Sequence, residues 1–512
     1  MSILRPDRRR GRNARNLSFQ LAPLGPESAE WIDLDRRLEP GHLARLISRS
    51  LRLLDLGRLW RLYASFGSPA YPPHLLLAVV LFETQRGHHC PAQWHRHANE
   101  SIPVRWLLRG LTPSRACWYQ FRDRLGPEML GLAQQVVRAA IADGFTTAER
   151  AAIDGTLLAA NASRHELLGQ AALEQRCVLL REAVAGDQRG VPPQAAPGWL
   201  AATLAGRRQQ AKRYAKASEE MARRQNLNGQ KRASKRTPKE NMRISAGDPE
   251  AALGRDKEKV FRPLYNVQML DDLDSPLILG WQVVAQPNDA GLLGGVLRQA
   301  KAGLGVSVEE VVADAGSAGG ADLAEARALG ATVYAPWQAN DYSGPKAGKY
   351  YAKERFEWQP GQNAYLCPQG QRLPLKRSSQ QKRSSTRRIE LQMYQGDERT
   401  CGRFAAREEC TPGKGARTIS RSEYEEHLEE LRERMKGEEA RRLYKRRKQT
   451  VELANADLKE HRGSRRLSGR GQKRAEAQVG LTVLANNLVA LDGSRRRRKE
   501  RATVVTPCLP DP

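Results

Sequence analysis

The sequence predicts an α/β fold that an all-helical segment precedes and that basic insertions interrupt. From about residue 28 to 130, apolar residues recur at helical spacing. From residue 151 onward, short apolar runs are typical of strands. A Gly- and Ala-rich segment at 319–329 links the run at 308–314 to the run at 331–336, as the helix of a βαβ unit does.

The chain carries a large excess of positive charge. It has 512 residues, of which 85 are Lys or Arg and 57 are Asp or Glu, so its formal net charge is +28. This excess predicts a polyanionic partner, with nucleic acid as the first candidate. No apolar run approaches the roughly 18 residues of a membrane span, and no apolar segment follows the basic N-terminus as in a secretory signal. Seven cysteines, an odd number, fit a reducing cytoplasm better than a disulfide scaffold.

The first part of the chain is predicted to be a basic arm, 1–16, followed by a helical domain, 17–145. Three helices are expected there. One carries the stripe Leu43, Leu46, Ile47, Leu51 and Leu54; one is HLLLAVVLFETQRG, which starts behind Pro72–Pro73 and stops at Gly87; and one is capped by Thr112 with Pro113 at its first position. Short helices that carry arginines favour a helix-turn-helix-like DNA-binding unit. A plain helical bundle with a basic face is the alternative. The arginines are Arg96, Arg105, Arg109, Arg115, Arg122 and Arg124.

The second part, 146–492, is predicted to hold the α/β core. Two segments interrupt it: 166–245 is helical in composition and basic, and 339–420 is polar, turn-rich, basic and contains cysteines. A long amphipathic helix is expected from 421 to about 460, then a final helix at about 473–491 and a basic, Pro-rich tail at 493–512. The strands are expected at 151–154, 263–270, 276–285, 308–316 and 331–336, with DDLDS as a hairpin between the second and the third.

Three carboxylates stand out by their position. Asp154 ends the first expected strand and Asp314 ends a later one, so parallel pairing of these strands would bring both to one edge of the sheet. Glu452 lies on the long helix, which can cross that edge. A single buried Asp is more often a cap or an ion-pair partner. Three acidic side chains among cations are instead hard oxygen ligands suited to Mg²⁺ or Mn²⁺, and two such ions could stabilise the entering and leaving oxygens of a phosphodiester displacement.

The helix around Glu452, YKRRKQTVELANADLK, places cations near that acid. Tyr444 and Arg447 are neighbours one turn apart, and Lys459 lies two turns beyond Glu452 on the same expected face. Arg447 can hold a phosphate in a bidentate way. The alternative is a solvent-exposed charged helix with pairs between residues four apart.

Four stretches together resemble the DDE transposases of bacterial insertion sequences, whose catalytic domain is RNase H-like. They are AAIDGTLLAANAS, GDPEAAL with PLYNVQ, VVADAGS, and the helix with Tyr, Arg, Glu and Lys; the resemblance covers about residues 30 to 492. It implies that Asp154, Asp314 and Glu452 bind two Mg²⁺ ions, for which Mn²⁺ can substitute, and that Tyr444, Arg447 and Lys459 contact DNA phosphates. It also implies a bacterial, nucleoid-associated protein that acts as a homodimer on inverted-repeat ends and target double-stranded DNA, cutting the ends and joining them to the target.

The sequence departs from the best-known family pattern in three places. Four residues separate Arg447 from Glu452 where three are usual, LANAD follows Glu452 where a Phe-Gly pair is common, and Ser317 replaces an aromatic residue. Two alternatives therefore stay open. One is an RNase H-like nuclease or resolvase that cuts without joining. The other is a DNA-binding copy that has lost catalysis.

Two groups of potential metal ligands remain. Cys367, Cys401 and Cys410 lie where relatives often have four cysteines, but Phe404 stands in the fourth place, and structural zinc normally takes four ligands. The second group is His88, His89, Cys90, His95 and His97. Its spacing matches no known metal-binding pattern, so we expect histidines that face the surface or DNA.

Overall fold

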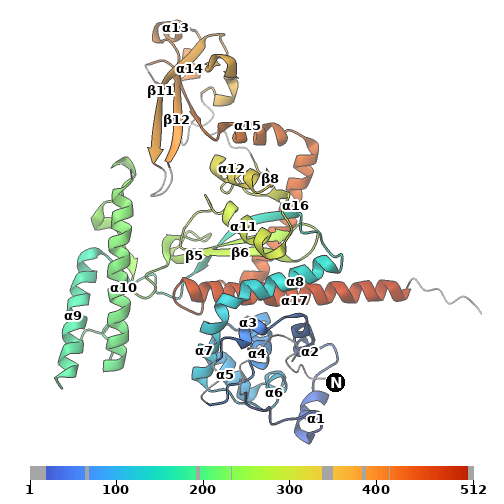
Figure 1. Ribbon diagram of the computed structural model, residues 1–512. Coiled ribbons are helices and arrows are strands. Elements are labelled where there is room, and N and C mark those ends of the chain that lie inside the picture. Colours follow the sequence, from blue (N-terminus) through green and yellow to red (C-terminus); the bar gives the residue numbers. More distant parts are fainter. Residues whose placement is uncertain are drawn as a thin grey trace, which may run out of the picture.

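The protein is described by a computed structural model that covers residues 19–63, 68–191, 196–231, 233–336, 350–382, 388–413 and 415–504. The arm expected at 1–16 lies outside these residues. Figure 1 shows a central sheet with helices packed below it, a long helical pair to the left and a second sheet above. The architecture is mixed α/β, as predicted. None of the described helices is both long and apolar enough to cross a bilayer.

The N-terminal part is helical, as the spacing of its apolar residues predicts. Helix α4 is apolar on nearly every side, which explains its burial, and it ends before Gly87, whose φ of +77° reverses the chain. The stripe from Leu43 does not form one helix, because α2 passes into a 3₁₀ turn at Leu51–Leu53. The helices are α1 (Ala29–Arg36), α2 (Leu43–Ser50), α3 (Gly57–Trp60), α4 (Pro73–Gln85), α5 (Pro91–Glu100), α6 (Ile102–Leu108), α7 (Arg115–Leu125) and α8 (Met129–Ala142).

The predicted cap of α7 was wrong by two residues. Ser114 is the N-cap, and its hydroxyl accepts a hydrogen bond from the backbone N–H of Cys117 at 3.3 Å. Pro113 therefore precedes the cap instead of occupying the first helical position. Both Thr112 and Ser114 are suitable caps by residue type, so the sequence alone does not choose between them.

The central sheet has the strand order β4-β5-β1-β7-β8, with β6 also paired to β5. Strand β5 runs antiparallel to β1 and β6, whereas β7 runs parallel to β1 and β8. The predicted hairpin and βαβ unit are both present, with α12 (Gly320–Ala328) as the crossover helix. The strands are β1 (Arg150–Ala159), β4 (Ala252–Arg255), β5 (Phe261–Asp272), β6 (Ile278–Val284), β7 (Glu310–Val312) and β8 (Thr332–Tyr334); α11 (Leu293–Leu304) connects β6 to β7.

The basic insertion forms an arm of two long helices, α9 (Gln170–Gln188) and α10 (Leu204–Gly229), which lie side by side in Figure 1. Apolar side chains between them, among them Leu173, Leu180 and Met221, form a small core of their own. Two short strands, β2 (Leu167–Leu168) and β3 (Ile244–Ser245), pair at the base of the arm. The insertion therefore leaves and rejoins the central fold at one place, and its predicted helical character is confirmed.

The cysteine-containing insertion holds a second sheet, which the sequence analysis did not predict. Its strands are antiparallel in the order β13-β12-β11-β10-β9. Strand β11, RLPLKRSSQQK, is mostly polar because only a small aromatic core, including Tyr365 and Tyr394, lies beneath the sheet. The elements are β9 (Glu357–Gln359), β10 (Ala364–Leu366), β11 (Arg372–Lys382), β12 (Arg388–Gln395), α13 (Glu398–Gly402), α14 (Arg407–Cys410) and β13 (Thr418–Ser422).

The long helix expected from 421 to 460 is divided. Helix α15 (Glu425–Arg434) ends before Gly437, which caps α16 (Glu438–Ala456), and a π-helical turn follows at Asp457–His461. The final helix, α17 (Gln472–Val504), is longer than predicted and continues through the basic run that was assigned to the tail. It packs against α8, α4 and β6 and so joins the N-terminal helices to the central sheet.

Candidate functional site

Asp154 lies in the middle of β1 and not at its end, because the strand continues to Ala159. Its neighbour in β5 is Met269. Strand β7 pairs with β1 only up to Ala152, so β7 ends before it reaches Asp154. Asp314 follows the end of β7 by two residues. The parallel pairing of β1 and β7 therefore brings the two aspartates to one region of the sheet, as expected.

Helix α16 covers Asp154 and contacts both of its carboxylate oxygens. The guanidinium of Arg447 donates a hydrogen bond to Oδ1 at 2.6 Å, and the side-chain amide of Asn455 donates one to Oδ2 at 2.6 Å. These residues are eight apart, which places them about 80° apart around the helix. Val451 lies between them and is buried against Ala152 of the sheet. The signature helix therefore binds the strand through an ion pair, an amide and one apolar contact.

The electrostatics around Asp154 combine burial with nearby charges. Burial raises the pKa of its carboxyl group, Arg447 and Lys257 oppose this, and Asp314 and Asp289 add to it. Burial likewise lowers the pKa of Lys459, with Lys257 contributing in the same direction, while Asp154 is among the groups that oppose it. Three cations and three carboxylates thus act on one another around the middle of β1. This mixture of charges is suited to a bound phosphate or a divalent cation.

Asp289 is a site residue that sequence reasoning missed. Its Oδ1 accepts hydrogen bonds from Asn266 at 2.7 Å and from Gln268 at 2.5 Å, both in β5. A Cβ at Gly155 would collide with this carboxylate, so glycine is needed after Asp154. Asn455 was missed as well. The signal for Asn455 in the sequence was its position eight residues after Arg447 in the same helix. The sequence around Asp289 gives no signal that this residue lies at the site.

Glu452 is exposed and points elsewhere. It lies five residues beyond Arg447, about 140° around the helix, whereas Val451 at about 40° faces the sheet. Within the described ranges, no hydrogen bond or ion pair joins Glu452 to Asp154 or Asp314, and these three residues do not form a group whose ligand atoms lie within 4.8 Å of one another. Tyr444 packs against the apolar cluster that contains Val451 and Ala152.

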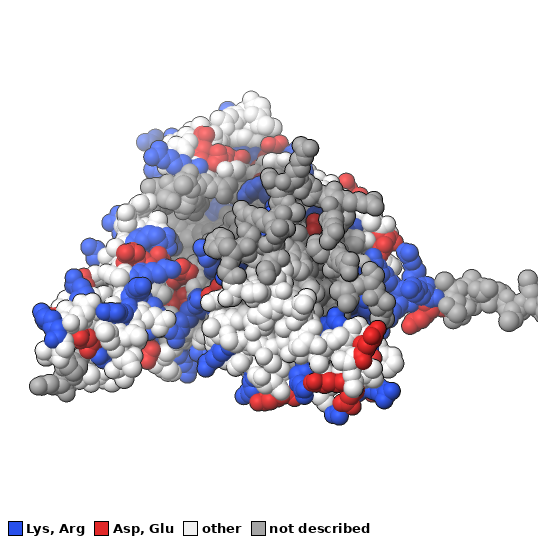
Figure 2. Space-filling view, turned by 60° about the horizontal axis from the view of Figure 1, so that its bottom comes forward, with Lys and Arg blue, Asp and Glu red and all other residues white. Residues whose placement is uncertain are grey.

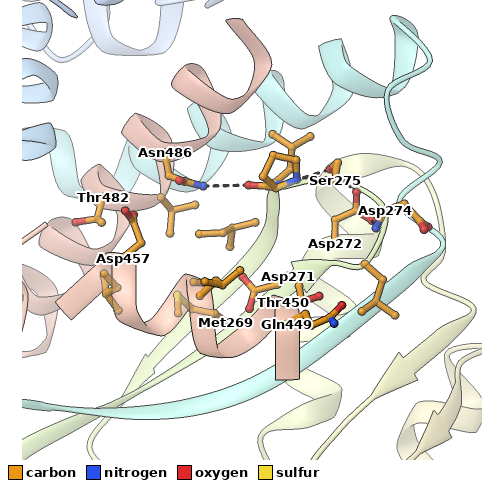
Figure 3. Close-up of a pocket in the computed structure, with 18 residues that line it drawn as sticks. Met269, Asp271, Asp272, Asp274, Ser275, Gln449, Thr450, Asp457, Thr482 and Asn486 are labelled. Carbon is orange, nitrogen blue, oxygen red and sulfur yellow. Dashed lines mark hydrogen bonds between the residues drawn. The ribbon is translucent and has the colours of Figure 1, made fainter. Parts of the chain in front are cut away.

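A cavity of about 460 Å³ lies between β5, α16 and α17 (Figure 3). Asp271 lines it, two residues along β5 from Met269 and therefore on the same face of the sheet. Neither carboxylate oxygen of Asp271 has a hydrogen-bond partner among the described residues. Burial raises the pKa of Asp271 well above its usual range, and Asp154 and Asp272 add to this.

The three cysteines of the second insertion line one small pocket together with Phe404. The thiol of Cys367 accepts a hydrogen bond from the backbone N–H of Gln371 at 3.3 Å. Burial raises the pKa of Cys410, and Cys401 and Cys367 contribute. The pocket is thus lined by three thiols and an aromatic ring.

Several arginines of the N-terminal helices interact with other groups of the protein. Arg105 pairs with Glu30, Arg109 donates to the carbonyl of Leu24, and Arg122 is buried beside Asp123. Arg105, although paired, is exposed, as are Arg96, Arg115 and Arg124. Four of the six arginines named for this region therefore lie at its surface.

Two other places carry exposed cations. Figure 2 shows them over the α9–α10 arm on the left and at the end of α17 on the right. Residues of the arm include Arg208, Lys212, Lys216, Arg223 and Lys231, and those of α17 include Arg496, Arg497, Arg498 and Lys499. Arg223 and Lys216 also pair with Glu220 and Glu250.

Comparison with known proteins gives one finding. Residues 366–491 match a family model described as a transposase DDE domain. The match covers strands β11 to β13 of the second sheet, α15, α16 and most of the final helix, and thus the helix that contacts Asp154. No curated protein and no solved structure gives a match. The match supports a DDE transposase and, with it, action on DNA.

Proposed function

We propose that the protein is a transposase that cuts the ends of its own mobile element and joins them to target DNA by direct phosphoryl transfer. The observation that carries the proposal is the contact of Arg447 and Asn455 with Asp154, made by the helix that matches a transposase DDE domain. The strand order supports an RNase H-like core, because antiparallel β6 and β5 precede the parallel set β1, β7 and β8.

The donor set around β1 fits a divalent cation. Asp154 and Asp314 offer hard oxygen ligands, the type that Mg²⁺ and Mn²⁺ prefer. Asp271, whose two oxygens have no hydrogen-bond partner among the described residues, lies near Asp154 as a further carboxyl group. A bound Mg²⁺ pair would activate the attacking water or 3′-hydroxyl and stabilise the leaving oxygen. Asp154 accepts one hydrogen bond on each oxygen, which leaves a lone pair on each for a cation.

The cations of the site have separate roles. Arg447 neutralises Asp154 in the free protein and is in place to hold a phosphate once that carboxylate binds metal. Lys459, which follows α16 in the π-helical turn, interacts with the charge of Asp154 and can contact the same DNA strand. Tyr444 packs against the sheet and would contact the strand from that place.

We further propose that the α1–α8 helices, the α9–α10 arm and the end of α17 bind the DNA ends, with two copies of the chain bringing the ends together. Exposed arginines and lysines on the arm and on α17 support this.

The outward position of Glu452 favours a second candidate, a DNA-binding protein without catalysis. Full activity requires α16 to turn or shift so that Glu452 approaches Asp154. The transposase requires this motion of α16, and the non-catalytic DNA-binding protein does not.

The test uses end-labelled duplexes that carry the DNA flanking the coding sequence, in intact and pre-nicked form, with a plasmid as target. We expect nicking and joined products with Mg²⁺ and neither with Ca²⁺. Nicked DNA without joined products would identify a nuclease or resolvase. Binding without any cleavage in Mg²⁺ or Mn²⁺ would identify the non-catalytic candidate.

A further inference from the structure

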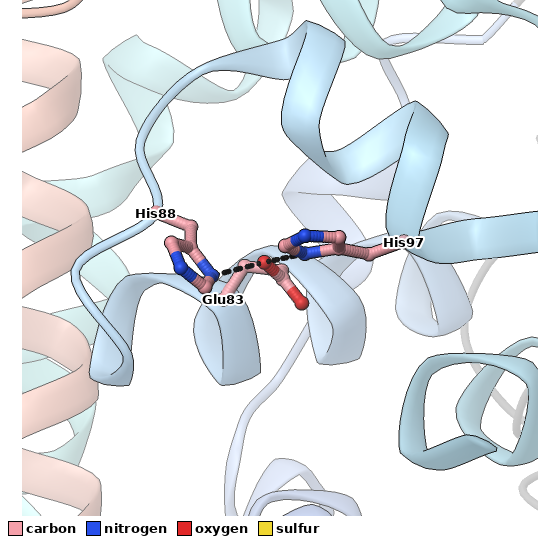
Figure 4. A group of neighbouring side chains, drawn as sticks. All are labelled: Glu83, His88 and His97. Atoms are coloured by element: carbon pink, nitrogen blue, oxygen red, sulfur yellow. Dashed lines mark hydrogen bonds and ion pairs between the residues drawn. The ribbon is translucent and has the colours of Figure 1, made fainter. Parts of the chain in front are cut away.

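A second cluster of metal-ligating side chains lies outside the β1 site, among the N-terminal helices. Glu83 of α4, His88 of the α4–α5 loop and His97 of α5 bring their ligand atoms within 4.8 Å of one another. Figure 4 shows the two rings on opposite sides of Glu83. This corrects the sequence-based expectation for His88 and His97, which converge on a carboxylate and do not simply face the surface or DNA.

Both imidazoles of the cluster contact the same carboxylate oxygen. Nδ1 of His88 lies 2.8 Å from Oε2 of Glu83, and Nδ1 of His97 lies 2.7 Å from the same oxygen. Two imidazoles therefore direct the same ring nitrogen to one oxygen atom. Two imidazole nitrogens and one carboxylate oxygen are the ligands found in many three-ligand zinc sites.

Glu83 is also costly to bury without a cation. It is the only charged residue of α4, and its side chain is 1% exposed. A buried carboxylate normally requires a counter-charge. A divalent metal ion would neutralise Glu83 and use the same three atoms.

Local structure fixes His88 over Glu83. The N–H of His88 donates to the carbonyl of Glu83 at 2.9 Å and the N–H of Gly87 donates to that of Thr84 at 3.0 Å, which is the Schellman pattern of a helix end. The indole of buried Trp94, one turn before His97, donates to the carbonyl of His88 at 2.7 Å. The positions of both histidines are thus set by the backbone of α4 and α5.

We infer that Glu83, His88 and His97 bind one transition-metal ion, with Zn²⁺ as the first choice. The side chains of His88 and His97 are 30% and 21% exposed, so water can reach the ion and complete its coordination. The ion would fasten the α4–α5 loop to both helices. The same loop supports the segment after α16, because Ser468 donates to the carbonyl of His89 at 3.0 Å.

The test is titration of the metal-free full chain with Co²⁺, followed by absorption spectroscopy, and with Zn²⁺, followed by calorimetry. We expect one equivalent with a tetrahedral Co²⁺ spectrum lacking thiolate charge-transfer bands, tight binding that weakens at acidic pH, and a higher melting temperature. His97→Gln can still donate a hydrogen bond to Glu83 but offers no imidazole, and should lose this binding. His95→Gln is the matched control on the same helix, since His95 contacts the carbonyl of Pro113 instead, and should retain it.

Three outcomes would overturn the inference. The first is no Co²⁺ or Zn²⁺ binding by the wild-type chain. The second is binding that His97→Gln leaves unchanged while its circular dichroism shows a folded chain. The third is a spectrum dominated by thiolate bands, which would assign the ion to the cysteine pocket.

Discussion

Two carboxylates of this protein have contrasting partners. Asp154, which is partly buried, accepts one hydrogen bond from a guanidinium and one from an amide nitrogen, so one lone pair of each of its oxygens is occupied. Glu83, which is buried, contacts two imidazoles, which are themselves metal ligands. The β1 carboxylate is thus engaged by α16 in the free protein, whereas the α4–α5 carboxylate is surrounded by metal-ligating groups.

The largest expected effect is on catalysis. Asp154→Asn keeps the shape of the side chain but removes a metal ligand, so cleavage of end DNA should fall by about 10⁴-fold or more while DNA binding persists. The measurement is the single-turnover cleavage rate together with a binding isotherm. Asp143→Asn is a matched control, since Asp143 also pairs with an arginine, Arg495, at 2.7 Å. Equal rates for both variants would remove Asp154 from the reaction.

The free energy of unfolding should depend on pH through His89, which lies in the loop between α4 and α5. Burial lowers the pKa of His89 to about 4, so below pH 6.5 the unfolded chain binds a proton that the folded chain does not. The free energy of unfolding should therefore fall by up to about 3 kcal/mol from pH 7 toward pH 4 through this residue. Urea unfolding of wild type and His89→Gln across this range isolates the contribution. If the free energy of unfolding changed with pH in the same way for both proteins, His89 would not have a lowered pKa in the folded chain.

Loss of the ion pair at the β1 site should cost less. Arg447→Ala leaves Asp154 partly buried without its cation, and we expect unfolding to become easier by about 2 kcal/mol. Arg447→Lys should recover part of this through its charge. In metal titrations, Arg447→Ala should bind Mn²⁺ more tightly than wild type, because one competitor for Asp154 is gone. Weaker Mn²⁺ binding would show that Arg447 does not compete with the metal for Asp154.

The smallest expected effect concerns the carboxyl group of Asp271. Burial raises the pKa of Asp271, so its ionised form is less stable in the folded chain than in the unfolded chain, and this cost to folding grows as pH rises. Asp271→Asn needs no proton and should stabilise the protein at pH 8 by about 1 kcal/mol, with less gain at pH 5. Thermal melts at both values test this. A variant that is less stable at pH 8 would mean that Asp271 is ionised and has a role there.

Much of the fold could be predicted because it depends on local patterns. The apolar spacing of α4, the Gly after it and the run of strands with one crossover helix all gave the correct elements. The second sheet was missed because strands such as β11 have polar residues on both faces and bury little. The break of the long helix at Gly437 was also missed, although glycine is a weak position in a helix.

The site was predictable only in part, for geometric reasons. Spacing along the chain placed Asp154 and Asp314 together, because parallel strands share an edge. Spacing did not show that Asp289, in the loop after β6, lies close enough to Asp154 to raise its pKa. It also did not show that Val451, and not Glu452, faces the sheet. For His88 and His97, spacing in sequence matched no pattern because the third ligand, Glu83, lies on the preceding helix.

The most direct test of the two sites is cleavage of the protein backbone by bound Fe²⁺, which replaces Mg²⁺ and, with ascorbate and peroxide, generates radicals that cut the chain next to the metal. In the presence of end DNA, we expect cuts near residues 154 and 314 that Mg²⁺ suppresses and that Asp154→Asn abolishes. Cuts confined to the region of residues 83–97, with none near 154 or 314, would contradict a divalent-cation centre at β1.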